Sequence, residues 1–102
     1  MNISRKLQNK LYEFVSSNAS LFEGFEHVYL FGSIIKEGSH PRDIDLLLIY
    51  SEYTNGIIDD AKLITSALEC EIALPLDLTV LSKEELMNTH FLDKINNYVM
   101  LK

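Results

Sequence analysis

Hydrophobic residues near the start of the chain recur every three or four positions, with charged and amide residues between them. This spacing predicts an amphipathic helix over about residues 3–17, because such a repeat forms one apolar face in an α-helix. The serine-containing stretch 16–20 should end it. A second segment with the same repeat runs from about residue 57 to residue 68 and predicts another amphipathic helix.

Three short runs rich in aromatic, β-branched and other apolar residues predict strands, at residues 27–31, 43–50 and 76–81. The middle run is apolar on both faces after its first residues. That pattern is typical of a central strand whose beginning emerges at the end of the sheet. Between the first two runs, residues 33–37 fit one or two helical turns that finish at Gly38.

The last third of the chain predicts a helix after the third strand. Ser82 followed by Glu85 is the signature of a capping box, and apolar residues from Leu86 to Val99 fit one broad helical face beyond it. The chain shows no internal repeat, low-complexity tract or linker, so residues 1–102 are expected to form a single domain. The order of elements predicts an α/β or α+β fold with a small mixed β-sheet and helices packed mainly on one side.

The composition narrows the possible partners and location. With 9 Lys and Arg against 15 Asp and Glu, the formal charge is -6, so long nucleic acid is not expected as a direct ligand. No run approaches the roughly 18 apolar residues of a membrane span, and the first residues lack the apolar core of a signal peptide. The single cysteine, Cys70, excludes an intrachain disulfide and is expected to be a buried or half-buried residue before a strand. We therefore expect a cytoplasmic protein.

Two aspartates at the beginning of the second predicted strand carry the clearest chemical signal. Asp43 and Asp45 are two positions apart, so a strand directs both carboxylates to the same face. Like charges at this distance repel each other unless a cation neutralises them, and Mg²⁺ prefers such oxygen ligands. Asp77, inside an otherwise apolar strand, would add a third carboxylate if its strand lay beside the second. The pattern predicts a site for divalent metal ions, with two Mg²⁺ ions expected.

A glycine and a serine lie just upstream, where the first predicted strand meets a short helix. Backbone amides at such a junction have no intrahelical partners and point towards any anion in front of them. Gly32 permits close approach of the chain, and the Ser33 hydroxyl adds a donor. The strand, the anion-binding turn and the carboxylate strand together are typical of phosphoryl or nucleotidyl transfer.

The segment LFGSIIKEGSHPRDIDLLLIY resembles the signature of the DNA polymerase β-like nucleotidyltransferase superfamily: a hydrophobic strand, Gly-Ser, a spacer, and Asp-x-Asp in a second strand. PLDLTVLS looks like the strand that carries the third carboxylate of that superfamily. The motifs span residues 27–81, and the order of elements agrees over the whole chain. The similarity is greatest to the minimal nucleotidyltransferases that are paired with HEPN-domain proteins in toxin–antitoxin modules.

The resemblance implies a role for each matching residue. Gly32 and Ser33 would bind the triphosphate, Asp43 and Asp45 would hold the metal ions, and Asp77 would complete the site and help to activate the acceptor hydroxyl. The chain would then be a metal-dependent enzyme that uses ATP as substrate and transfers AMP to a tyrosine of a HEPN ribonuclease, which acts as the toxin. After Gly-Ser the family tends to carry arginine or another polar residue, whereas this chain has two isoleucines.

Other interpretations stay open at this level. The chain could be a catalytically weak or inactive antitoxin with the same fold that neutralises its partner by binding alone. Asp43 and Asp45 could also be solvated residues that begin a strand after Pro41. Modification of a small molecule is disfavoured, because 102 residues leave no second domain for an acceptor pocket.

Overall fold

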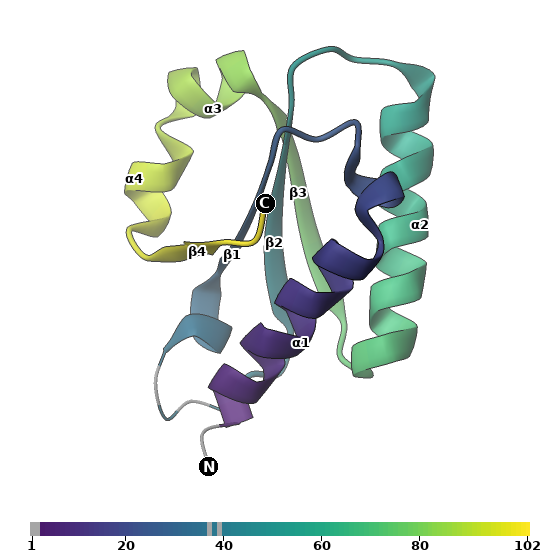
Figure 1. Ribbon diagram of the computed structural model, residues 1–102. Helices are drawn as coiled ribbons and strands as arrows, with labels where there is room; N and C mark the ends of the chain where they lie inside the picture. The colour runs from purple at the N-terminus through teal and green to yellow at the C-terminus, as the bar shows by residue number, and fades with distance from the viewer. Residues whose placement is uncertain (1–2, 37, 39) are drawn as a thin grey trace.

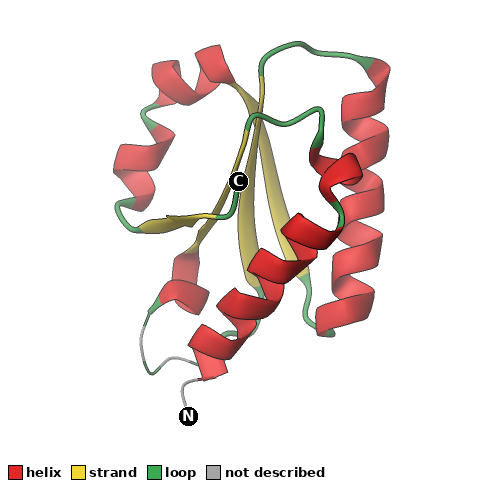
Figure 2. Cartoon of the chain, in the orientation of Figure 1, coloured by secondary structure: helices red, strands yellow, loops and turns green. Residues whose placement is uncertain are grey.

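The computed structural model describes residues 3–36, 38 and 40–102, which form a four-stranded mixed sheet with helices on both faces (Figures 1 and 2). The α-helices are α1 (Ile3–Ser17), α2 (Asn55–Ile72), α3 (Lys83–Thr89) and α4 (Phe91–Ile95). Two short 3-10 helices are η1 (Ala19–Phe22) and η2 (Gly32–Ile35). The strands are β1 (His27–Phe31), β2 (Ile44–Tyr50), β3 (Leu76–Ser82) and β4 (Tyr98–Met100).

The strands lie in the order β3-β2-β1-β4. β1 is antiparallel to both of its neighbours, β2 and β4, whereas β2 and β3 are parallel and are connected through α2. β2 is therefore a central strand, as its apolar sequence predicts, and it is buried over most of its length.

The two faces of the sheet are covered differently. The main core lies between the sheet and the two longer helices, α1 and α2, and contains Val28, Leu30, Leu46 and Leu48 from the strands. On the other face a smaller cluster surrounds Tyr29, Leu47 and Ile49, and α3 and α4 contribute Leu86, Phe91 and Leu92 to it. Alternation along β1 and β2 supplies both cores, as expected for strands that are covered on each side.

The predicted α/β class with a small mixed sheet is confirmed, and so are the helix at 3–17 and the strand at 27–31. The capping box also forms. The Glu85 N–H donates to Ser82 Oγ and the Ser82 N–H donates to Glu85 Oε1, each at 3.0 Å. The second strand begins at Ile44, one residue later than predicted, which leaves Asp43 in the bend before it.

The prediction of one helical face reaching Val99 was wrong. The helix is interrupted at His90, whose left-handed conformation (φ 53°) separates α3 from α4, and it ends at Asn96 (φ 67°). Tyr98 then pairs with Phe31 in the sheet, so β4 gives β1 a hydrogen-bonded neighbour on its second side. The aromatic and β-branched residues at 98–99 satisfy a strand as well as a helix, and pairing with β1 decides between the two.

Cys70 also differs from expectation, because it lies exposed in the last turns of α2. No helix of the described part of the chain is long and apolar enough to cross a membrane.

Candidate functional site

The candidate site lies on one row of residues that crosses the whole sheet. In the strand register Asp77 of β3 is opposite Asp45 of β2, Asp45 is opposite Phe31 of β1, and Phe31 is opposite Tyr98 of β4. Residues paired in register share a face of the sheet, so these four side chains point to the same side. This is the side covered by α3 and α4. The carboxylates of Asp45 and Asp77 are therefore direct neighbours on this side of the sheet.

The pKa of Asp45 is affected by both of the other predicted carboxylates, Asp43 and Asp77. Partial burial raises the pKa of Asp45 first, and the negative charges of Asp43 and Asp77 raise it further, together with a hydrogen bond between the side chains of Asp45 and Asp77. Each of these effects disfavours the ionised form of Asp45. The structure thus brings all three aspartates into electrostatic contact, with Asp45 at the centre and Asp77 exposed to solvent.

The chemistry of these donors fits a hard divalent cation, since carboxylate oxygens that repel one another are stabilised by such an ion. Within the residues described, no group of three or more His, Cys, Asp or Glu side chains is gathered closely enough to hold a metal ion as it stands. The assignment of Asp43, Asp45 and Asp77 as metal ligands stays a prediction.

Gly32 brings the Gly-Ser turn directly against Asp45. Its backbone has φ +84°, and a Cβ placed there would overlap the Asp45 carboxylate, with the Asp45 Cγ at 3.1 Å. Only glycine combines this conformation with such a close approach. The cradle that a Cβ would fill is the strongest sign that the turn and the carboxylate belong to one site. Ser33 follows as the second residue of η2, where its carbonyl accepts from the Lys36 N–H at 3.1 Å.

Helix α1, on the main-core face of the sheet, holds the Gly-Ser turn in place. Ser4 is buried and its hydroxyl donates to the carbonyl oxygen of Ile34, and Gln8 Nε2 donates to the same oxygen at 3.0 Å. The Ser4 hydroxyl also lies 3.3 Å from the carbonyl oxygen of Lys36. Sequence reasoning missed both residues. Their signal was available, because positions 4 and 8 are one turn apart among the apolar positions of the first helix.

A second set of hydrogen bonds fixes the position of Asp77 relative to β2. The Glu69 carboxylate at the end of α2 accepts the Leu76 N–H at 2.9 Å, and the Pro75 carbonyl accepts the Ile44 N–H at 3.0 Å. These contacts fix where β3 begins relative to β2. Asp77 is therefore held opposite Asp45 in part by Glu69, which lies outside the predicted motifs.

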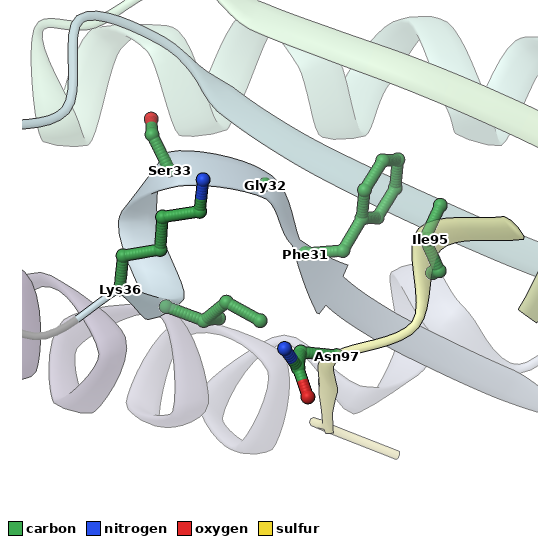
Figure 3. Close-up of a pocket in the computed structure, with 7 residues that line it drawn as sticks. Phe31, Gly32, Ser33, Lys36, Ile95 and Asn97 are labelled. Carbon is green, nitrogen blue, oxygen red and sulfur yellow. The ribbon is translucent and has the colours of Figure 1, made fainter.

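A pocket of about 430 Å³ opens beside the turn (Figure 3). It is lined by the end of β1, by η2 and the residue after it, by the last residue of α4 and by the segment between α4 and β4: Phe31, Gly32, Ser33, Ile35, Lys36, Ile95 and Asn97. Its volume is within the range of small-molecule sites. Gly32 and Ser33 were predicted as site residues. The wall formed by Ile95 and Asn97 was not, because that segment was assigned to a helix.

Comparison by sequence finds no matching family model and no matching curated protein. Comparison of structures does find similar folds. A chain of the MntA–HpeT toxin–antitoxin complex, in a variant with two aspartates replaced by glutamate, matches with a TM-score of 0.61 and 16% identity. The match covers 92% of this chain and 71% of that one.

Two further structures show the same likeness. A candidate nucleotidyltransferase from Sulfolobus solfataricus matches with a TM-score of 0.57 and 25% identity, over 95% of this chain and 80% of that chain. A chain of the Shewanella oneidensis complex between a tri-AMPylated HEPN toxin and an MNT antitoxin has a TM-score of 0.58 and 15% identity. That match covers 91% of this chain and 71% of the other. The present chain therefore has a nucleotidyltransferase fold.

Proposed function

We propose that the protein is a metal-dependent nucleotidyltransferase that transfers AMP from ATP to a hydroxyl group of a partner protein. The observation that carries this proposal is the contact between Gly32 and Asp45, with Asp77 opposite Asp45 in the next strand. A triphosphate bound at the Gly-Ser turn would lie directly beside the carboxylates. Nucleotidyl transfer needs this juxtaposition of phosphate and acidic residues.

The transfer exchanges the phosphoanhydride bond between the α- and β-phosphates of ATP for a phosphoester bond to the acceptor. The acceptor oxygen forms a bond to the α-phosphorus, the bond from that phosphorus to the bridging oxygen breaks, and pyrophosphate leaves with the bonding electron pair. Asp77 is exposed beside Asp45, and in this proposal it takes the proton of the acceptor hydroxyl. Mg²⁺ held by Asp43 and Asp45 would supply charge neutralisation for the triphosphate and for the leaving group.

The Gly-Ser turn has the complementary task of holding the phosphates. In Figure 3 the Lys36 side chain runs beside the Gly32–Ser33 turn, so its ammonium group can reduce the negative charge there. The amides of the turn and the Ser33 hydroxyl supply hydrogen-bond donors to the phosphate oxygens. A chain with a formal charge of -6 needs such local cations to accept a polyanion.

A toxin of the HEPN class is the proposed acceptor. Two of the structurally similar proteins are chains of toxin–antitoxin complexes, and in one of these the HEPN toxin is tri-AMPylated beside an MNT antitoxin. In the other, the two substituted aspartates are separated by a single residue, as Asp43 and Asp45 are here. These parallels support a role as the antitoxin that modifies and silences its partner.

The test is a transfer assay with a HEPN partner, Mg²⁺ and ATP labelled on the α-phosphate. The double variant Asp43→Asn, Asp45→Asn should lose transfer by several orders of magnitude, because it removes the carboxylates that hold the metal ions. A matched control is Glu52→Gln with Asp59→Asn, which removes two exposed charges beyond the other end of β2 and should leave transfer unchanged.

Co-expression separates transfer from neutralisation by contact. If transfer is the mechanism, the site variant should still bind the partner in a pull-down but should fail to protect cells from the toxin. Full protection by the site variant, together with normal binding, would refute the enzymatic proposal and would favour an antitoxin that acts by binding alone.

A further inference from the structure

The pocket beside the Gly-Ser turn has walls of two kinds. Phe31, Ile35 and Ile95 provide aromatic and aliphatic surface, whereas Lys36 and Asn97 provide polar groups. In Figure 3 Lys36 lies beside the turn, and Asn97 lies on the other side of the pocket. A cavity that is apolar along its body and carries a cation at one side and an amide at the other suits a ligand with a flat ring and an anionic group.

The polar side opposite the turn is built by an uncommon backbone conformation. Asn96 has φ 67° and ψ -58°, and the Asn97 N–H donates to the Ile95 carbonyl at 2.7 Å, which closes a γ-turn centred on Asn96. This positive-φ γ-turn is rare and strained for a residue other than glycine. Such strain persists where the surroundings impose it, and it is concentrated at functional sites.

Contacts of the chain before and after the γ-turn hold it in this conformation. Upstream, the Asn96 N–H donates to the Leu92 carbonyl at 3.1 Å and closes the last turn of α4. Downstream, Tyr98 is paired with Phe31 in the sheet and its ring packs edge-to-face on Tyr29, with the ring centroids 5.2 Å apart. The chain between α4 and β4 is therefore short and fixed, and it brings Ile95 and Asn97 to the pocket.

We propose that this pocket holds the nucleoside of the bound nucleotide and that the Asn97 carboxamide selects adenine. The inference deepens the proposed function and rests on it. The phosphates would lie at Gly32 and Lys36, next to Asp45, and the base would lie between Phe31 and the γ-turn.

Adenine matches the chemistry of Asn97. A carboxamide offers one donor and one acceptor side by side, and adenine presents the complementary pair at its amino group and N7. The same edge of guanine presents two acceptors, of which a single carboxamide can satisfy only one. The apolar walls accept either purine, so the discrimination depends on Asn97.

The test measures binding to the isolated full chain in Mg²⁺, with MgATP and MgGTP competing against a fluorescent ATP analogue. Wild type should prefer ATP by about tenfold, the low end for a two-bond contact, because Asn97 is exposed. Asn97→Ala should bring the two nucleotides to within about twofold of each other. Asn97→Asp, whose carboxylate only accepts hydrogen bonds, should weaken the binding of both nucleotides and keep a preference for ATP, because at this edge only adenine offers a donor.

The matched control is Asn88→Ala, which removes an exposed asparagine of α3 that does not line the pocket and should retain the ATP preference. Equal binding of ATP and GTP by wild type, an unchanged ratio in Asn97→Ala, or a preference for GTP in Asn97→Asp would overturn this inference and leave the proposed transfer reaction standing. An ATP preference that Asn97 controls, without transfer to any HEPN partner, would support the pocket assignment and count against the proposed function. Failure of wild type to bind either nucleotide would overturn both.

Discussion

Replacing Gly32 with alanine perturbs the candidate site at the point where the turn meets the carboxylate. The new side chain would have to adopt φ +84°, and its Cβ would overlap the Asp45 carboxylate. Two separate penalties follow. The left-handed conformation disfavours any side chain, and the overlap forces the Asp45 side chain to rotate away from the turn.

Each penalty has a known scale. A non-glycine residue in the left-handed region costs about 1–2 kcal/mol. Moving Asp45 off its rotamer adds about 0.5–1.5 kcal/mol. The sum is a loss of roughly 1.5–3.5 kcal/mol in the free energy of unfolding, which for a domain of this size lowers the melting temperature by roughly 6 °C or more.

Gly38 provides the matched control, because it also has a positive φ (+78°) but a Cβ there meets no heavy atom within 4 Å among the described residues. Urea unfolding should show Gly38→Ala losing only the conformational part, about 1–2 kcal/mol. Asp45→Ala should partly rescue Gly32→Ala in a double-mutant cycle, since the remaining Asp45 Cβ lies at an ordinary contact distance of 3.4 Å. Equal losses at the two glycines, without rescue, would show that the turn and Asp45 are not in close contact.

Two further predictions concern the supports of the site. Ser4→Ala should lower the free energy of unfolding by about 1–2 kcal/mol in urea titrations, because it removes a buried donor to the Ile34 carbonyl, whereas the exposed Ser16→Ala should change it little. In EDTA, Asp45→Asn should gain stability relative to wild type as the pH rises from 3 to 7. Because the pKa of Asp45 is raised in the folded state above its usual 3.8, first by burial and then by the charges of Asp43 and Asp77, the contribution of Asp45 to wild-type stability falls as the pH rises through that window. A flat difference between the two proteins would contradict the raised pKa of Asp45.

The sequence was sufficient to locate the chemical groups of the site because each is tied to a strong local signal. Asp45 and Asp77 each interrupt an apolar strand, and Gly32 stands where a strand ends. Their meeting was predictable only on the condition that the two aspartate strands are neighbours. Parallel pairing of β2 and β3 through α2 fulfils that condition and sets Asp45 opposite Asp77.

The remaining parts of the site depend on contacts between distant segments. Ser4 and Gln8 look like ordinary helix residues until η2 is packed against them, 26 to 32 positions further along the chain. The position of Asn97 in the pocket wall could not be predicted from the sequence for another reason. Residues 91–99 carry a pattern compatible with a continuous helix, and only the pairing of Tyr98 with Phe31 stops it and produces the turn. Tertiary pairing overrides local propensity there.

The alternation of β2 links the core to the direction of the carboxylates. Ile44, Leu46 and Leu48 are buried in the main core beneath α1 and α2, so Asp45 has to point to the opposite face. A slip of one residue in register would turn Asp45 into that core, where an ionised carboxylate without a partner is strongly disfavoured. The apolar positions that stabilise the fold therefore also hold Asp45 in the row with Asp77. Burial of every second residue of β2 is therefore enough to direct the Asp45 side chain to the face with Asp77.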